Sequence, residues 1–265
     1  MIDLHSHILP GVDDGSPDLP TSLEMARMAA ADGILVMACT PHFMPGMYDN
    51  DARDIRHRVA DLRRRIADAG ISLALVVGSD AHIRPDFLTC LRGGRLLCLN
   101  DSRYVLFEPP HSIAPPRLEE LLFNIVVCGY VPILTHPERL KWIERHFSMF
   151  EKLVNFGVWM QITGGSLTGR FGKRPQYWAE KMLGAGMVRI LASDAHNLTS
   201  RPPILSDAFA IAKAEVGLSE ANNLLIVRPA NILDNQPAEK SPPILIAQKI
   251  AAAPPSRWRR MFMGA

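Results

Sequence analysis

The sequence lacks a long apolar run, a large net charge and an extreme composition. No stretch approaches the ~18 consecutive apolar residues that a membrane-spanning helix needs, so no such helix is expected. The formal net charge of +2 is too small to spread a nucleic-acid-binding surface over the molecule, and no nucleic-acid partner is expected. Apolar residues make up 48% and charged residues 21% of the 265 residues, which excludes a wholly disordered, collagenous or coiled-coil chain.

Cysteine is also scarce, with four in the chain and no close Cys-x-x-Cys pair. Cys39, Cys98 and Cys128 lie in apolar runs, which indicates reduced core thiols rather than disulfides or a thiolate metal site. Arginines lie near Cys90 and Cys98 without forming the compact loop of a cysteine-dependent phosphatase, so that class of enzyme is not favoured. The first residues lack the basic segment and apolar stretch of a signal peptide, and we therefore expect a cytoplasmic protein.

Short β-rich segments alternate with helical segments along most of the chain. The clearest helix covers residues 51–69, where Ile55, Val59, Leu62 and Ile66 recur at helical spacing between charged residues. Further helices are predicted at 19–32, 117–128, 140–156 and 176–183, and strands at 1–5, 34–39, 73–77, 104–107, 131–134, 158–162 and 188–191. This alternation indicates an α/β fold of parallel strands covered by helices, and about seven units favour a closed or nearly closed barrel.

Residues 235–265 differ from the rest of the chain. They contain five prolines and carry a net charge of +4, from five Lys and Arg against Glu239. We expect a barrel over residues 1–234, followed by a proline-rich basic tail that is partly disordered or contacts another subunit of a homo-oligomer. A short helix is predicted at residues 244–253. Basic residues beside Trp258 and Phe262 leave a peripheral contact with a membrane surface open.

Histidines and carboxylates follow nearly every predicted strand. They come from seven segments, which are His5-Ser6-His7, Asp13-Asp14, Thr40-Pro41-His42, Gly78-Ser79-Asp80, Phe107-Glu108, His136-Pro137-Glu138-Arg139 and Asp194-Ala195-His196. In barrels and open α/β sheets, the C-terminal ends of the strands form the active-site face, so these side chains are expected to meet. Burying so many ionisable groups without a cation would cost several kcal/mol each, and the pattern therefore predicts a multinuclear metal site.

The remaining histidines fit this pattern less well. His57 lies in the arginine-rich helix and His146 in a charged segment, so both are expected at the surface or packed against a partner. His82, two residues after Asp80, is expected to support the pocket at most. His111 follows two prolines and is expected near the rim of the pocket.

Several of these motifs together resemble a known family. They are MIDLHSHILPGVDDG at the start, TPH at 40–42, FE at 107–108, THPER at 135–139, and SDAHN with RPP at 193–203. The ordered set is similar to the PHP (polymerase and histidinol phosphatase) superfamily, and most of all to the metal-dependent bacterial protein-tyrosine phosphatases of capsule and exopolysaccharide loci. The resemblance covers about residues 1–233 and implies a distorted seven-unit βα barrel of the PHP type, with the metal site at the C-terminal ends of its strands.

The resemblance also implies three divalent metal ions, usually manganese, with iron or zinc as alternatives. The first ion would be held by His5, His7, Asp80 and Asp194, the second by Asp80, Glu108 and His136, and the third by Asp14, His42 and His196. Arg139 and Arg201 would clamp the phosphate. One position departs from the family pattern, because Asp80 stands where a longer glutamate is usual, which affects the spacing or preference of the first two ions.

The chemistry of such a site suits a phosphomonoesterase. Metal ions lower the pKa of bound water, which supplies hydroxide at neutral pH, and cations with arginines stabilise charge on the phosphoryl oxygens. Phenol, with a pKa near ~10, leaves more readily than an alkyl alcohol, which suits phosphotyrosine. The resemblance implies a protein-tyrosine phosphatase that acts on a tyrosine kinase of capsule or exopolysaccharide assembly. A small-molecule phosphatase such as histidinol phosphatase, a metal-dependent amidohydrolase or lactonase, and a catalytically silent binding barrel stay open as alternatives.

Overall fold

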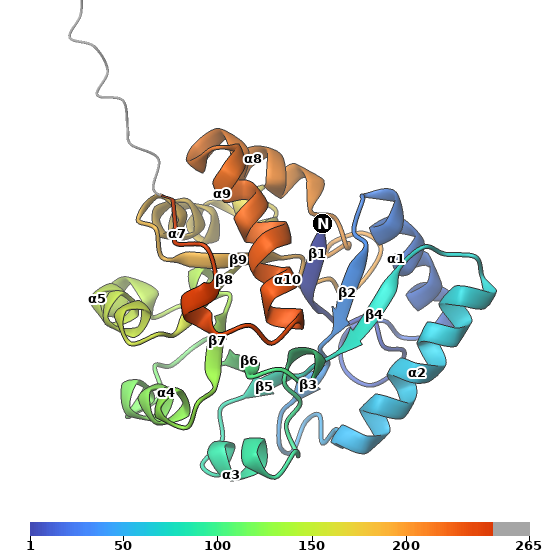
Figure 1. Cartoon of the computed structure of the whole chain (residues 1–265), viewed down its shortest axis with the longest axis horizontal. Helices are drawn as coiled ribbons and strands as arrows, with labels where there is room; N and C mark the ends of the chain where they lie inside the picture. Colours follow the sequence, from blue (N-terminus) through green and yellow to red (C-terminus); the bar gives the residue numbers. More distant parts are fainter. Residues whose placement is uncertain (246–265) are drawn as a thin grey trace, which may run out of the picture.

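A computed structural model describes residues 1–245 of the chain. Its strands pair in parallel throughout and form two sheets (Figure 1). The three-stranded sheet contains β1 (Ile2–Ser6), β2 (Val36–Cys39) and β4 (Ala74–Val77), in that order. The six-stranded sheet contains β3 (His42–Phe43), β5 (Asp80–His82), β6 (Tyr104–Glu108), β7 (Val131–Thr135), β8 (Trp159–Thr163) and β9 (Val188–Ala192). All seven strands predicted from the sequence are present.

Two of the predicted strands are followed at once by a second short strand that the sequence did not reveal. β3 begins three residues after β2 ends at Cys39, and β5 begins three residues after β4 ends at Val77. Pro41 interrupts the first of these strands because proline has no N–H to donate, but its carbonyl accepts a hydrogen bond from Asp80 N at 3.0 Å. His42 and Asp80 are therefore direct neighbours in the parallel pairing of β3 with β5.

The two sheets meet at β1 and β9. Asp194 N donates to His5 O at 2.9 Å, and His7 N donates to Ala195 O at 2.8 Å. These bonds join the edge of one sheet to the edge of the other, so the strands curve around a common interior. The predicted α/β barrel with parallel strands is confirmed, while the count of seven units stays a prediction because two strands are each divided.

Helices cover the outside of this barrel. They are α1 (Leu19–Ala31), α2 (Ala52–Asp68), α3 (Phe87–Arg92), α4 (Leu118–Val127), α5 (Ile143–Asn155), α6 (Gly164–Leu167), α7 (Lys173–Gly184) and α8 (Ser206–Val216). The helix predicted at residues 51–69 is confirmed as α2, and its spaced apolar residues are buried. Asp51 begins this helix by accepting hydrogen bonds from Arg53 N and Asp54 N. Across residues 1–245, every helix falls short of the length and hydropathy that a membrane span requires.

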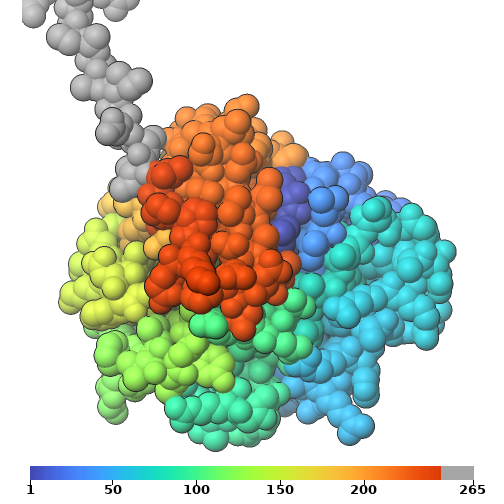
Figure 2. Space-filling view, in the orientation of Figure 1, coloured from blue at the N-terminus to red at the C-terminus, as the bar shows by residue number. Residues whose placement is uncertain are grey.

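A separate group of apolar residues fills the barrel itself, including Leu4, Tyr104, Ile133 and Trp159. Ile232 of α10 (Arg228–Leu233) joins this group, so α10 closes the end of the barrel where the strands begin. In Figure 1, α10 lies across the barrel in front of the strands, and Figure 2 shows the same orange and red segment covering that face. The sequence patterns predicted none of the helices after residue 205.

The first part of the predicted tail lies against the same end of the barrel. Arg103 N, just before β6, donates to Asn235 Oδ1 at 2.9 Å, and Tyr104 Oη donates to Gln236 O at 2.8 Å. The division of the chain at residues 234 and 235 stays a prediction. The basic residues beside Trp258 and Phe262, and most of the helix predicted at 244–253, lie outside the described residues. The four cysteines are free, and Cys39 and Cys90 are buried.

Candidate metal centre

The nine predicted metal-binding residues converge at the end of the barrel opposite α10. Seven of them are buried, while His42 is half-buried and Asp14 exposed. They come from the C-terminal part of β1, the loop after it, β3, β5, the end of β6, and the loops after β7 and β9. The structure thus brings together side chains that span residues 5–196 in the sequence. Their role as metal ligands stays a prediction.

His5 and His7 form the centre of the cluster. Their Nε2 atoms lie 3.2 Å apart, and each lies 3.4 Å from Asp194 Oδ1. His5 Nδ1 lies 2.8 Å from Gln161 Oε1, which can only accept, so Nδ1 carries the proton and Nε2 faces the cluster. Burial opposes protonation of His5, but Asp194 and Asp80 outweigh it and raise the pKa of His5 to about 9. The same negative potential that favours this proton would favour a divalent cation in its place.

Asp194 joins the histidines to the two predicted arginines. Its Oδ1 faces His5 and His7, while its Oδ2 accepts hydrogen bonds from Arg139 Nη1 and Arg201 Nη2, each at 2.6 Å. Burial favours the neutral carboxyl, but His5 and Arg201 hold the pKa of Asp194 well below its usual range. Both arginines therefore lie directly at the predicted metal cluster.

Asp80 and Glu108 form a second group with His42. His42 Nδ1 lies 3.5 Å from Asp80 Oδ2 and 3.2 Å from Glu108 Oε2. Both oxygens of Asp80 are buried, and within residues 1–245 neither has a hydrogen-bond partner. A buried carboxylate normally accepts hydrogen bonds or binds a cation, because an uncompensated charge is costly. The lack of hydrogen-bond partners for the Asp80 carboxylate is the observation that best fits a metal ion, so an aspartate at this position is compatible with metal binding.

Asp14 and His196 complete a third group with His42 and His7. Asp14 Oδ1 lies 3.4 Å from His42 Nε2 and 3.5 Å from His196 Nε2. His196 Nδ1 lies 3.0 Å from Asp194 O, so it donates to that carbonyl and leaves the buried Nε2 free. Burial and the neighbouring His7 lower the pKa of His196 to about 4, which favours the neutral imidazole that metals bind.

Two of the predicted ligands have backbone conformations that are rare outside glycine. His136 has a φ of 36° and directly follows β7, and Asp194 has a φ of 52° and lies two residues after the end of β9. Residues with positive φ are uncommon and cluster at functional sites, where the surrounding structure holds them in place. Burial and the nearby Arg139 keep the pKa of His136 well below its usual range, so this imidazole is neutral.

Several supporting residues were not assigned a role from the sequence. Asp13 Oδ2 accepts from His7 Nδ1 at 2.7 Å and from His42 N at 3.0 Å, while Oδ1 accepts from Gly15 N at 2.9 Å. Gln161 orients His5 in the same way. A side chain at Gly15 would lie 2.1 Å from His7 O, so only glycine allows this close approach. The Asp13-Asp14-Gly15 motif could have indicated a supporting role for Asp13, whereas no sequence motif indicated one for Gln161.

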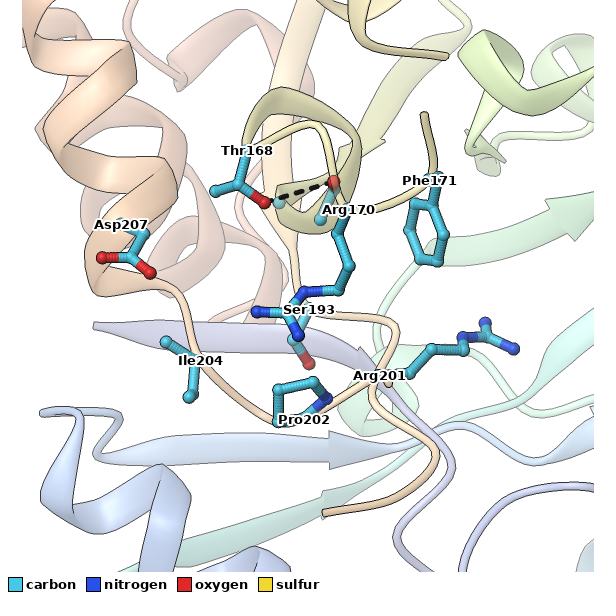
Figure 3. A pocket seen from close by; sticks show the side chains of 10 residues that line it. Thr168, Arg170, Phe171, Ser193, Arg201, Pro202, Ile204 and Asp207 are labelled. Atoms are coloured by element: carbon cyan, nitrogen blue, oxygen red, sulfur yellow. Dashed lines mark hydrogen bonds between the residues drawn. The ribbon is translucent and has the colours of Figure 1, made fainter. Parts of the chain in front are cut away.

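Beside the arginines lies a small depression lined by two loops (Figure 3). Arg170 and Phe171 come from the loop after α6, and Arg201 and Pro202 come from the loop after β9. Arg170 Nη1 donates to Thr199 O at 3.1 Å and ties the loops together. The guanidinium carbon of Arg139 lies 4.8 Å from the centre of the Phe171 ring, so this aromatic side chain supports one of the two arginines.

Comparison with known proteins finds relatives that match along most of this chain. The family model for capsular polysaccharide synthesis, CpsB/CapC, matches residues 1–234. Tyrosine-protein phosphatase YwqE from Bacillus subtilis (strain 168) is 36% identical over 243 residues, which are 92% of this chain and 95% of YwqE. Tyrosine-protein phosphatase CpsB from Streptococcus agalactiae is 28% identical over 244 residues, which are 89% of this chain and 99% of that protein.

A solved structure agrees with these sequence matches. It belongs to a study of YwqE from Bacillus subtilis and CpsB from Streptococcus pneumoniae, which are described as metal-dependent tyrosine phosphatases. The match has a TM-score of 0.86 and 36% sequence identity, and it covers 89% of this chain and 96% of that chain. The resemblance inferred from the sequence motifs is therefore confirmed.

Proposed function

Because the chain belongs to the capsular polysaccharide synthesis CpsB/CapC family, we propose that it is a metal-dependent protein-tyrosine phosphatase. One structural observation supports this proposal in addition to family membership. Asp80 has two buried oxygens that accept no hydrogen bond from residues 1–245, and they face imidazoles and a second carboxylate. Such a carboxylate is stable beside a cation and costly without one.

We assign the ligands in three groups, of which the first two share Asp80. His5, His7, Asp80 and Asp194 form the first, Asp80, Glu108 and His136 the second, and Asp14, His42 and His196 the third. The donor set holds imidazoles and carboxylates without thiolate, which suits manganese, with iron or zinc as alternatives. When bound, such ions lower the pKa of coordinated water and neutralise charge on a phosphoryl group.

The two arginines are placed to bind the phosphoryl oxygens. Arg139 and Arg201 each use one terminal nitrogen on Asp194 Oδ2, which fixes their position at the edge of the cluster. Arg201 Nε is buried and has no partner within the described chain, so it can donate to an incoming oxygen. A guanidinium held in this way stabilises negative charge that grows on the phosphoryl group, because no reorganisation is needed during the reaction.

The proposed substrate is a phosphotyrosine protein, namely a bacterial tyrosine kinase of capsule or exopolysaccharide assembly in the cytoplasm. The family model names capsular polysaccharide synthesis, and the relatives are named tyrosine-protein phosphatases. A phenolate leaves without strong help from a general acid, because its conjugate acid has a pKa near ~10. A small-molecule phosphatase or an amidohydrolase is not favoured, since the relatives that match in sequence at 36% and 28% identity along most of their length are named tyrosine-protein phosphatases.

The test is hydrolysis of a phosphotyrosine peptide by the full chain after metal removal and reloading. Separate samples receive Mn²⁺, Fe²⁺, Zn²⁺ or Mg²⁺, and histidinol phosphate serves as the comparison substrate. We expect at least one metal to restore peptide hydrolysis and the His136→Ala variant to lose both metal and turnover. Faster hydrolysis of histidinol phosphate would favour the small-molecule phosphatase. Failure of both substrates despite bound metal would favour the silent barrel, and full activity with full metal in His136→Ala would remove His136 from the site.

A further inference from the structure

His111 lies closer to the cluster than its position in the sequence suggests. It follows Pro109 and Pro110 in the loop between β6 and α4, where the sequence predicted a residue at the rim. The structure places His111 Nε2 3.3 Å from Glu108 Oε1, and the His111 ring centre 5.0 Å from the ring centre of His136. The ligand atoms of Glu108, His111 and His136 all lie within 4.8 Å of one another.

The loop holds His111 in this position through contacts with the chain after His136. Lys141 N donates to His111 O at 2.8 Å, and Trp142 Nε1 donates to Pro110 O at 2.9 Å. Two consecutive prolines further restrict the backbone, because each fixes its own φ and narrows the conformation of the residue before it. The imidazole is therefore presented by a loop that is tied to the segment carrying His136 and Arg139.

The Nε2 atom of His111 has the same unsatisfied character as the predicted ligands. It is buried and has no hydrogen-bond partner within residues 1–245, although the ring as a whole is partly exposed. An imidazole nitrogen that points at a carboxylate without a good hydrogen bond is the arrangement expected when both ligate one ion.

Glu108 divides its two oxygens between two sides of the cluster. Oε2 lies 3.2 Å from His42 Nδ1, whereas Oε1 lies 3.3 Å from His111 Nε2 and 3.7 Å from His136 Nε2. Glu108 Oε1 and the two imidazoles thus form a set of three donors on the side away from His42. With Asp80 assigned to the same ion, His111 would raise the number of its protein ligands from three to four.

We propose that His111 is a direct ligand of the metal ion held by Glu108 and His136. This inference rests on the proposed function only in taking that cluster to bind metal, and it adds a donor that the family resemblance did not supply. The His111 imidazole would add a nitrogen donor to the donor set of that ion. A hydrogen bond from His111 to Glu108 is the competing role, in which the imidazole would only orient the carboxylate.

The two roles are separated by metal binding in two substitutions. The full chain is stripped with a chelator and titrated with Mn²⁺, and bound metal is then counted by elemental analysis. His111→Ala and His111→Gln should both weaken binding of one Mn²⁺ by at least about 10-fold, since even the loss of a group behind a ligand costs about 10–100-fold. Glutamine can donate to Glu108 but is a poor replacement for an imidazole ligand. His57→Ala, at an exposed position of α2, is the matched control and should bind as the unmodified chain does.

Co²⁺ supplies a readout that does not depend on activity. Its visible absorption reports the number and type of ligands, so the His111→Gln spectrum should change while the His57→Ala spectrum should not. Unchanged Mn²⁺ affinity and Co²⁺ spectra in both His111 variants would overturn the inference, and restored affinity in His111→Gln alone would assign the hydrogen-bonding role instead. Failure of the unmodified chain to hydrolyse phosphotyrosine would count against the proposed function and leave these metal measurements unaffected. Circular dichroism of each variant verifies that it is folded.

Discussion

The barrel buries charged groups at both of its ends, but the two ends differ in how many of the buried polar atoms have hydrogen-bond partners. At the end where the strands begin, Arg228 and Glu220 form a buried ion pair in which every polar atom of both side chains has a partner. At the end where the strands finish, histidines and carboxylates crowd together, and several of their atoms have none. The comparison shows how a structural charge cluster can be told from a binding site.

The ion pair is satisfied by its own surroundings. Arg228 donates to both oxygens of Glu220, at 2.7 and 3.0 Å, and Arg228 Nη1 lies 3.4 Å from Arg189 O. The remaining donors reach Pro242 O and Pro243 O, at 3.1 and 2.8 Å. Glu220 also accepts from Asn223 Nδ2 and from Leu245 N. Since nothing is left for a ligand, this cluster holds α9 (Leu218–Asn222), α10 and residues 242–245 together.

The other end has the opposite pattern. Asp80 lacks a donor for either oxygen, and buried nitrogens of His42, His136 and His196 lack partners within the described chain. Buried polar groups are nearly always hydrogen-bonded in folded proteins, so a concentration of exceptions in one place is typical of a ligand-binding site. In this molecule, the buried ion pair whose atoms all have hydrogen-bond partners holds elements of the fold together, whereas the buried polar atoms without partners concentrate at the predicted metal site.

Breaking the structural pair should have the largest effect on stability. Arg228→Ala leaves the buried Glu220 without its partner and should lower the free energy of unfolding by about 3–5 kcal/mol. Urea denaturation monitored by circular dichroism measures this change. Metal bound per folded molecule should stay the same, because the pair lies at the opposite end of the barrel from the cluster.

The matched control replaces both partners. The double variant Arg228→Met, Glu220→Leu removes both charges and should recover most of the lost stability, since apolar residues of similar volume often replace a buried ion pair without loss. A double variant as unstable as Arg228→Ala would mean that the backbone contacts of Arg228, rather than the missing charge partner, dominate.

Sequence patterns could predict the functional end because its residues repeat a simple rule. His5 and His7 lie two residues apart, at the end of β1 and just beyond it, and Asp194 and His196 lie together just after another strand. The ends of parallel strands meet at one edge, so the convergence of these groups could be anticipated. Strands and long amphipathic helices could be predicted for a similar reason, since each has its own characteristic spacing of apolar residues along the sequence.

The structural end has no such rule, and most of it was missed. The helices after residue 205 carry weak periodicity, and the pairing of Arg228 with Glu220 depends on how α9 and α10 meet. Supporting contacts at the functional end, such as Gln161 on His5, also depend on neighbouring strands rather than on spacing. His111 was placed at the rim because a proline-rich loop does not reveal which way it turns.

Removing one arginine from the functional end should greatly lower the rate of phosphotyrosine hydrolysis and leave the amount of bound metal nearly unchanged. Arg139→Ala removes a donor from the phosphoryl group and should lower kcat for a phosphotyrosine peptide by about 100-fold, or about 2.7 kcal/mol. Steady-state kinetics and elemental analysis measure the two quantities. Arg201 still pairs with Asp194 in this variant, so bound metal should not change. Loss of metal together with rate would count against the phosphate-binding role of Arg139.

Asp13→Asn alters how the metal ligands are held, while keeping the size of the side chain. The amide nitrogen cannot accept hydrogen bonds, so His7 Nδ1, His42 N and Gly15 N would compete for the one remaining acceptor oxygen. Metal affinity should fall by about 10–100-fold, the usual cost of losing a carboxylate behind a ligating histidine. Asp18→Asn, which changes the residue that begins α1, is the control and should leave affinity unchanged. Equal affinity in both variants would show that Asp13 is only a loop contact.

Tyr104→Phe should have the smallest effect and tests the structural end alone. The hydroxyl donates to Gln236 O at 2.8 Å, whereas the buried ring packs inside the barrel and is kept by phenylalanine. Loss of this hydrogen bond should reduce the free energy of unfolding by about 1 kcal/mol, because Gln236 O loses its partner. Exposed Tyr177→Phe is the control and should change stability less. Metal affinity and kcat should be unchanged in both variants. A change in either quantity would mean that the two ends of the barrel are coupled, so that the structural and the functional charged groups are not independent.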